Sequence, residues 1–433
     1  MPFLLPPDAA ERVPAHNEVH VRPARPLPIP SMTTQITVLT ASHDSTAEAS
    51  HLRSLAATHG AQIGSTDVGL VLNLGDAAEL SWERHDEYSV YTIHQPFDSS
   101  GVAADTNLLS YLPLPAGWLT EVPGHTVAAV HVLLVDGAGR SDEEAVTLAE
   151  TTLGQQGRLV GSRLRDSCAR LFTTFRLHPD GTSRFLLVCD DMTAGRAGRV
   201  SGSLLEVERY RTLALLAYPS ARALILRLSR LEEQLADLVR TFEDEQRDDH
   251  ELLDDLILLA ASVERDIASH TGRFSAARAY FALVQQRIDY LRGGSLPGLM
   301  GVFTFLLRRL VPAISTVESA QTRIEELSGR VSRTADVLRT RVEVEAQSRT
   351  QELLSELRRG QTMQLRLQQT VEGLSVAAIS YYLVALVGIG AKGLHSVGLS
   401  INASLAQALA IPLAVWLVWR TVHRARRIHP TSA

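Results

Sequence analysis

The chain has 433 residues, of which 45% are hydrophobic and 21% are charged, and its formal net charge at pH 7 is −6. This length allows two or three domains, and the composition excludes a disordered chain. The basic residues are interleaved with acidic ones rather than gathered into a patch, so the sequence predicts no nucleic-acid partner.

Residues 1–34 are rich in proline, which fixes φ and removes amide donors, so we expect an extended arm lying on a folded surface. The opening residues lack the basic stretch and the uninterrupted apolar run of a signal peptide, so the folded body is expected in the cytoplasm. Within the arm, His16, Glu18 and His20 project to one side of an extended chain and could bind zinc or another transition metal. The alternative, which we favour, is that Glu18, His20 and Arg22 anchor the arm through polar contacts.

Residues 35–200 are expected to form an α/β domain with one mixed sheet. Runs rich in β-branched and aromatic residues predict its strands. These runs are Ile36–Thr40, Gly69–Asn73, Tyr88–His94, Thr126–Val135, Arg170–Leu177 and Arg184–Cys189. Pro179-Asp180-Gly181 is a strong turn signal, and it predicts a hairpin between the last two strands.

Two helices are expected between these strands, over Ser45–His59 and Asp142–Leu153. Ser141 and Glu144 have the spacing of a capping box at the start of the second helix. The two cysteines, Cys168 and Cys189, are interpreted as buried free thiols.

Residues 201–372 are expected to be long helices, because strand signals vanish after about residue 201. The predicted helices are Ser201–Leu216, Ser220–Phe242, Asp248–Tyr290 and Pro312–Val371. Proline and glycine predict the breaks between them, at Pro219, at Gly293-Gly294-Ser295 with Pro297, and at Pro312. The apolar run Leu296–Leu307 is too short to span a bilayer and is expected to pack in a core.

The last of these helices carries a stripe of apolar and small residues with an eleven-residue period, which loses its phase after Arg349. The stripe comprises Ile324, Leu327, Val331, Ala335, Leu338, Val342, Ala346 and Leu353. A helix cannot bury such a stripe alone, so we expect a coiled-coil-like region that packs on the preceding helices, on copies of the chain, or on both.

Residues 373–420 predict a transmembrane hairpin, with spans at about 373–391 and 402–420. Neither span holds a charged residue before Arg420, and nineteen helical residues extend roughly 28 Å, close to a hydrocarbon core. The predicted anchor residues are Gly373, Ser380, Tyr381, Tyr382, Trp416, Trp419, Arg420 and Arg424. Residues 421–433 form a basic tail, and by the positive-inside rule both termini are expected in the cytoplasm. A buried hairpin in a soluble core, and a second segment lying in the membrane plane, are the alternatives.

Several segments resemble an uncharacterised bacterial family of predicted membrane-anchored proteins. They are His16–Pro23 (HNEVHVRP), Trp82–His85 (WERH), Leu204–Arg211 (LLEVERYR), Arg308–Ala313 (RRLVPA) and Gln369–Tyr382 (QTVEGLSVAAISYY). The resemblance covers nearly the whole chain. It implies a location in the bacterial inner membrane, and it carries no activity.

The order of parts also resembles, more loosely, the CorA class of magnesium channels. That class has a Gly-Met-Asn motif at the end of its first span, where this chain has Val387–Lys392 (VGIGAK). The missing motif weakens an expectation of cation conduction, and architecture alone does not transfer function.

Other polar groups have structural interpretations that we favour over chemical ones. The acidic stretch Glu243–Asp255 could attract divalent cations but more simply forms a solvated face. Glu83 and His85 could act as acid and base but more simply pair across strands. Glu206, Arg209, Tyr210 and Arg211 are expected at a joint between sheet and helices, with anion binding as the alternative.

No phosphate loop, nucleophile elbow or C-x-x-C pair occurs, so neither a cofactor nor a catalytic residue is predicted. The sequence therefore predicts a non-enzymatic, membrane-anchored and self-associating scaffold whose cytoplasmic domain binds a protein partner or a small ligand. A CorA-like oligomeric channel or transporter is the second hypothesis. A metal enzyme using His16, Glu18 and His20 is the third.

Overall fold

The computed structural model describes residues 25–40, 45–60, 69–99, 101–154, 159–243, 248–396 and 402–428, together with Ala9 and Arg12. The candidate metal ligands His16, Glu18 and His20 lie outside these described residues. The chain divides into two compact units. One unit comprises Met1–Arg247 with Asp254–Thr334, and the other comprises Asp248–Leu253 with Ala335–Ala433.

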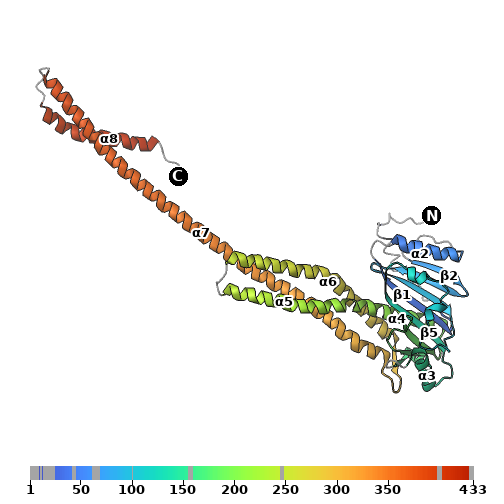
Figure 1. Ribbon diagram of the computed structural model, residues 1–433. Helices are drawn as coiled ribbons and strands as arrows, with labels where there is room; N and C mark the ends of the chain where they lie inside the picture. Colours follow the sequence, from blue (N-terminus) through green and yellow to red (C-terminus); the bar gives the residue numbers. More distant parts are fainter. Residues whose placement is uncertain are drawn as a thin grey trace, which may run out of the picture. The chain divides into compact units, whose positions relative to one another are not determined.

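A nine-stranded sheet forms the centre of the first unit, with the strand order β2-β3-β4-β1-β5-β8-β7-β6-β9 (Figure 1). The strands are β1 (Ser31–Leu39), β2 (Gly69–Gly75), β3 (Ala78–Arg84), β4 (Tyr88–Pro96), β5 (His125–Asp136), β6 (Val160–Leu164), β7 (Ala169–Thr173), β8 (Ser183–Cys189) and β9 (Arg292–Ser295). β5 and β8 pair in parallel, and the other neighbouring strands pair antiparallel. The predicted mixed sheet is confirmed, and β1 starts at Ser31, inside the segment expected to be arm.

Eight of the nine strands fall into two successive groups, each with a strand, a helix and three further strands, and β9 is added at the edge. α2 (Ser45–Thr58) follows β1, and α3 (Asp142–Leu153) follows β5. The predicted capping box at α3 is confirmed, because Ser141 accepts from the Glu144 amide and Glu144 accepts from the Ser141 amide. The predicted hairpin also forms, and Gly181 adopts a φ of 78° in the turn between β7 and β8.

Helices cover both faces of the sheet, which gives three layers. On one face, Leu52 and Leu55 of α2 and Ala145 and Ala149 of α3 pack into a core with inward residues of the strands. On the other face lie α4 (Ala194–Leu215), the end of α6 (Asp249–Leu291) and the start of α7 (Val302–Ser396). The free thiols of Cys168 and Cys189 are buried in this second core.

The expectation that strands end near residue 201 was wrong, because β9 pairs with β6 at the edge of the sheet. β9 reads Arg-Gly-Gly-Ser and is exposed, so it carries no hydrophobic alternation that could reveal it. Gly293 makes the pairing possible, since a Cβ there would lie 2.4 Å from the backbone of Leu164.

The prediction of a helix break at Pro312 was also wrong, because α7 runs without interruption from Val302 to Ser396 and contains this proline. Buried side chains flank the proline on both sides, including Leu310, Ile314 and Val317. Each such burial contributes about 1.5–3 kcal/mol, which together outweigh the roughly 3 kcal/mol that an interior proline costs. The break near Pro219 does occur: α4 ends at Leu215, α5 (Ala217–Glu243) follows, and Pro219 falls in its first turn.

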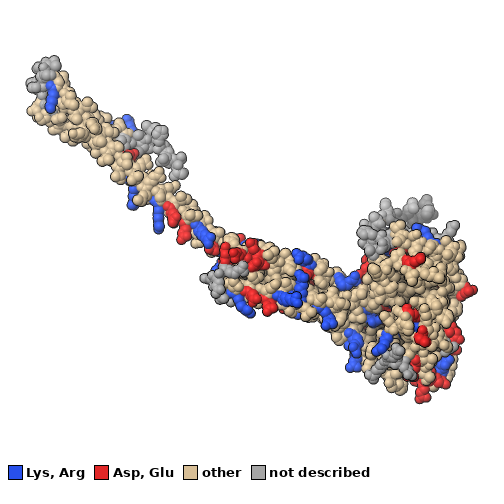
Figure 2. All heavy atoms as spheres, in the orientation of Figure 1, with Lys and Arg blue, Asp and Glu red and all other residues tan. Residues whose placement is uncertain are grey.

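The two predicted membrane spans lie in two helices, and both helices are long and apolar enough to cross a membrane. These are α7, in its last part, and α8 (Ala403–Ile428). Figure 2 shows few charged side chains over the last part of α7 and the start of α8, whereas red and blue atoms interleave over α5 and α6.

Candidate functional site

A cavity of about 630 Å³ lies between α4 and the polar side of strands β1 to β4. Its walls combine charged, hydroxyl, amide and apolar groups. The polar lining residues are Arg25, Gln35, Glu79, Ser81, Glu83, Thr92, His94, Glu206 and Arg209.

The strand period places these groups on the cavity side. In β3, Glu79, Ser81 and Glu83 line the cavity, while the alternating residues Leu80 and Trp82 are buried in the core on the opposite face. The strand therefore separates an apolar face packed on α2 and α3 from a polar face turned toward α4.

Glycines on α4 shape the opposite wall. The backbone of Arg25 passes so close to Gly198 that a Cβ at Gly198 would lie 1.9 Å from the Arg25 carbonyl oxygen. The amide of Leu27 donates to the carbonyl of Ala194 at 2.9 Å, which fixes this crossing. Arg25 is thereby held at the cavity, where it forms an ion pair with Glu79.

The cavity is lined by a neutral histidine and by a side-chain amide whose oxygen can still accept a hydrogen bond. Burial, followed by the positive charge of Arg25, lowers the pKa of His94 to about 4. Its Nδ1 shares a hydrogen bond of 2.9 Å with the hydroxyl of Thr33. Gln35 donates to Thr92 at 3.1 Å, while its buried carbonyl oxygen has no hydrogen-bond partner among the described residues. Such a wall can both donate to and accept from a polar ligand.

The cavity brings together two segments that the sequence had treated separately. Glu83 comes from the predicted cross-strand pair, and Glu206 and Arg209 come from the predicted joint between sheet and helices. Arg209 also stacks on Tyr210, with its Cζ 4.7 Å from the ring centre, and Glu206 forms an ion pair with Arg287. These two cavity residues therefore also tie α4 to its surroundings.

Sequence reasoning missed Arg25, Gln35, Glu79 and His94 as cavity residues. The sequence signal for these residues was the alternation of polar and apolar residues along each strand, but a sheet face exposed to water produces the same pattern. Only the placement of α4 over that face turns it into a cavity wall.

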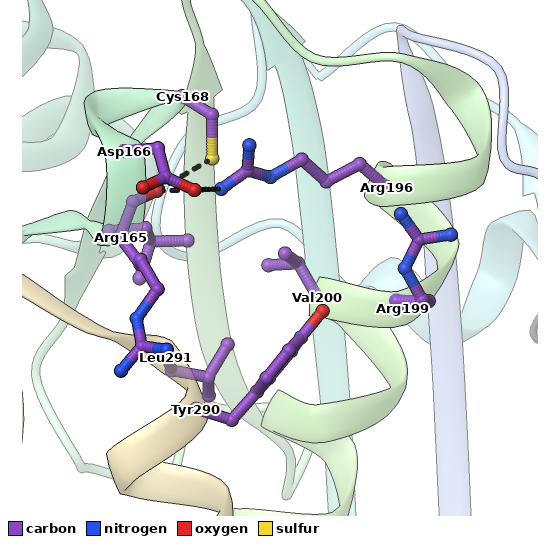
Figure 3. A pocket seen from close by; sticks show the side chains of 9 residues that line it. Arg165, Asp166, Cys168, Arg196, Arg199, Val200, Tyr290 and Leu291 are labelled. Atoms are coloured by element: carbon purple, nitrogen blue, oxygen red, sulfur yellow. Dashed lines mark hydrogen bonds and ion pairs between the residues drawn. The ribbon is translucent and has the colours of Figure 1, made fainter.

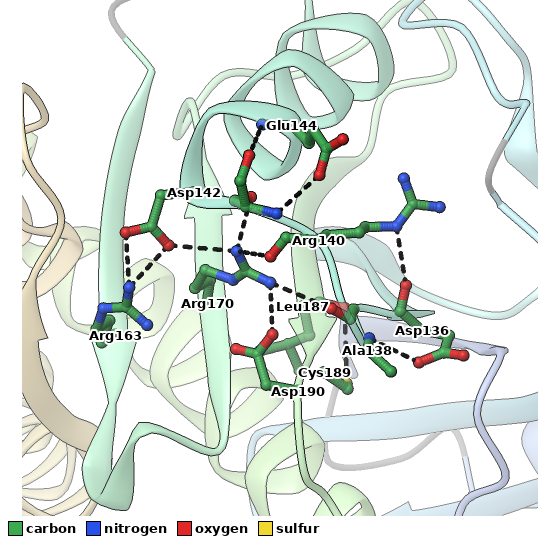
Figure 4. A network of polar contacts seen from close by, with 12 residues as sticks. Asp136, Ala138, Arg140, Asp142, Glu144, Arg163, Arg170, Leu187, Cys189 and Asp190 are labelled. Carbon is green, nitrogen blue, oxygen red and sulfur yellow. Dashed lines mark hydrogen bonds and ion pairs between the residues drawn. The ribbon is translucent and has the colours of Figure 1, made fainter.

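A second polar site lies at the carboxyl ends of the parallel strands β5 and β8, where α/β proteins often bind ligands (Figure 4). Arg170, which is 2% exposed, lies at its centre. Its Nη1 donates to the carbonyls of Arg140 and Ser141 at 3.0 and 2.8 Å and to Asp142 at 3.2 Å. Its Nη2 donates to the Gly137 carbonyl at 3.4 Å and to Asp190. Both terminal nitrogens of the guanidinium are occupied by these acceptors, so Arg170 holds the loops after β5 and β8 together.

Among the described residues, no group of three or more His, Cys, Asp or Glu could hold a metal ion. Within the acidic stretch, residues 244–247 are outside the described part of the chain, and Asp249 forms an ion pair with Arg341 at 2.8 Å. Glu83 and His85 approach to 3.9 Å, next to a stacked contact between His85 and Tyr88.

The predicted anchor residues lie on α7 and α8. Their aromatic members are exposed, from 50% for Trp416 to 73% for Tyr381. Gly373, Arg420 and Arg424 are exposed as well, whereas Ser380 is buried. Arg420 lies over the ring of Trp416, at 4.9 Å from its centre.

Comparison with curated proteins and with solved structures found no match. A family model described as "Protein of unknown function (DUF3422)" matches residues 7–429. This agrees with the resemblance to an uncharacterised family that the sequence segments indicated. With the match extending over nearly its whole length, the chain belongs to the DUF3422 family.

Proposed function

We propose that this chain is a non-enzymatic protein of the bacterial inner membrane, anchored by the ends of α7 and α8, whose α/β domain binds a polar ligand or partner in the cytoplasm. The observation that carries the proposal is the outward exposure of apolar side chains on the two helices. Leu374 is 73% exposed, Ile389 68% and Leu409 69%. Contiguous apolar surface of this kind is unfavourable in water and favourable in lipid.

Contacts between the two helices support a membrane hairpin. Among the described residues from 373 to 428, those that are buried are small or apolar, namely Ser380, Gly388, Ala391, Ala414 and Val418. A Cβ at Gly388 would lie 1.8 Å from the side-chain nitrogen of Gln407, so the glycine gives α8 a close approach. Small residues serve this purpose in membrane helix pairs, where lipid supplies no hydrophobic drive between helices.

The basic end of α8 supports an orientation with the C-terminus in the cytoplasm. Arg420 and Arg424, with two further arginines before the end of the chain, favour the cytoplasmic side. Because two spans return the chain to the side from which it came, the α/β domain and the helices before residue 373 then lie in the cytoplasm too. Cysteines introduced by Ser400→Cys and Ser432→Cys test this orientation, because the native thiols are buried.

In intact cells, a membrane-impermeant maleimide is expected to label Ser400→Cys and to leave Ser432→Cys unlabelled until the membrane is opened. The reverse pattern would contradict the orientation. Labelling of both variants in intact cells would contradict the hairpin.

The cavity beside α4 supports the binding role. Its walls offer hydrogen-bond donors and acceptors, and no cluster that could hold a metal ion occurs among the described residues. Its size lies within the usual range for small-molecule sites, about 300–1,000 Å³.

Self-association is the second part of the proposal. Every residue of α7 from Glu343 to Val371 is exposed. The eleven-residue spacing is lost after Arg349, but Leu353, Leu357, Leu367 and Val371 still fall within roughly 80° of arc at 100° per residue, so these four exposed side chains form an apolar face. It is the same face that is buried earlier in the helix at Ile324, Leu327, Val331 and Leu338. An uncovered continuation of a buried face favours pairing with copies of the chain.

The mass of the full-length protein in mild detergent, from light scattering with the detergent subtracted, tests this part. A dimer or trimer is expected from a paired α7. A strictly monomeric protein contradicts self-association, and a closed ring of four or more chains would favour the channel hypothesis instead.

A further inference from the structure

A smaller pocket of about 260 Å³ opens beside the start of α4, apart from the cavity described above (Figure 3). Three arginines from two segments surround it: Arg165 follows β6, while Arg196 and Arg199 lie in the first two turns of α4. Asp166 supplies the one carboxylate of the lining, so three guanidinium groups exceed it by two positive charges. Leu164, Val200 and Leu291 add an apolar wall, and Tyr290 adds a phenol.

Local contacts hold two of the arginines in place. Arg196 donates from Nη2 to the Arg165 carbonyl and to Oδ2 of Asp166, both at 2.8 Å. Arg165 donates from Nη2 to the carbonyl of Asp289 at 2.7 Å, at the end of α6. The thiol of Cys168 donates to the same Arg165 carbonyl at 3.5 Å, and burial raises its pKa, so it remains a thiol.

Most donors of the three guanidinium groups are not used by these contacts. Each guanidinium carries five N–H donors. Among the described residues, the Arg199 guanidinium has no hydrogen bond or ion pair, and Arg165 uses one nitrogen. The pocket therefore combines unused, forked donors with excess positive charge, which is the arrangement that recognises phosphate oxygens.

We propose that this pocket binds the phosphomonoester group of a small molecule. The phosphate would lie among Arg165, Arg196 and Arg199, and its two negative charges match the excess charge of the lining. The start of α4 strengthens the preference, because a helix carries partial positive charge at its N-terminus. An uncharged remainder of the ligand would lie against Val200 and Leu291.

The site does not depend on the membrane proposal. A phosphomonoester could come from a soluble metabolite or from a lipid headgroup, and two probes separate these sources. Glycerol 3-phosphate represents the first, and short-chain phosphatidic acid in mixed micelles represents the second. The full-length protein in an uncharged detergent is titrated with each probe by calorimetry.

Saturable binding of glycerol 3-phosphate that weakens as salt is raised supports a soluble ligand. Binding of phosphatidic acid alone supports the same pocket with a lipid headgroup. Absence of saturable binding of either probe up to about 10 mM, a concentration far above useful affinity, overturns the proposal.

A matched pair of variants assigns the binding to the pocket. Arg199→Gln removes an exposed guanidinium that has no hydrogen bond or ion pair among the described residues, so the fold is retained and affinity should fall about tenfold or more. Arg230→Gln removes an equally exposed arginine of α5 outside the pocket, and affinity should not change. An equal loss of affinity in both variants, or no loss of affinity in Arg199→Gln, contradicts the assignment. Arg165→Gln is a second pocket variant, and the same loss of affinity is expected for it.

Discussion

Individual buried charged residues stabilise the α/β domain through hydrogen bonds from which water is excluded. Asp180 shows this: its buried carboxylate accepts from Arg184 at 2.9 Å, from the Leu108 amide and from Thr182. Arg184 donates in turn to the carbonyls of Ala104 and Thr106. The turn residue that the sequence marked as a hairpin signal thus also ties the loop before β5 to the sheet.

Replacing Arg170 should damage this domain far more than replacing a partly exposed arginine. Arg170→Gln leaves Asp190 and several carbonyls without their buried donor, and breaking such a set costs about 3–5 kcal/mol of unfolding free energy. Arg163→Gln removes a partly exposed ion pair with Asp142 and should cost about 1 kcal/mol or less. Denaturant unfolding followed by tryptophan fluorescence compares the two, since Trp82 and Trp118 are buried in the domain. Equal losses would contradict the role given to Arg170.

Acid should destabilise the domain in a defined window because of its buried histidines. The pKa of His94 is lowered to about 4, so between pH 6.5 and 4 the unfolded chain binds a proton that the folded chain does not. The free energy of unfolding should therefore fall as pH falls through this window, by up to about 1.4 kcal/mol per pH unit for each such histidine. Burial lowers the pKa of His131 as well, which adds in the same direction. His94→Gln should flatten part of this dependence, and an unchanged slope would show that His94 is not buried in its neutral form.

Elements differ in how far sequence could predict them. The bounds of α3 were predicted correctly because its cap and its apolar period are local features. The exposed strand β9 and the passage of α7 through Pro312 were missed, because tertiary pairing and burial decide them. The cavity beside α4 could not be predicted for the same reason: its polar residues resemble a solvated sheet face until α4 covers them.

Two glycines of α4 offer a matched test of how closely this helix packs. In Gly198→Ala the new Cβ would meet the Arg25 carbonyl at 1.9 Å, so the backbone must shift and stability should fall by about 1–3 kcal/mol. At Gly202 nothing lies within 4 Å, so Gly202→Ala should stabilise the helix by up to about 1 kcal/mol. Thermal unfolding of the full-length chain measures both. Stabilisation by both substitutions would contradict the close crossing of residues 25–27.

The exposed apolar face of α7 predicts which residues control self-association. Leu353→Gln with Leu357→Gln should lower the mass in detergent to that of a monomer, because both side chains lie on the continued face. Val344→Gln, an equally exposed position on the opposite side of the helix, should leave the mass unchanged. An oligomer that survives the double substitution would place the contact elsewhere.

At the scale of the whole molecule, the chain joins an α/β domain, a long helical region and two apolar helices. The first unit buries most of its large apolar side chains, in cores on both faces of the sheet. The apolar ends of α7 and α8 do not, since few of their side chains are buried. This difference is the basis of our proposal that the ends of α7 and α8 anchor the chain in a membrane.

Extraction of cell membranes with alkaline carbonate tests the anchoring most directly, because it releases peripheral proteins and retains inserted helices. The full-length chain should stay with the membrane pellet, and a chain ending at Glu372 should appear in the soluble fraction with its tryptophan fluorescence intact. Release of the full-length chain by carbonate would contradict the central claim that α7 and α8 span the membrane.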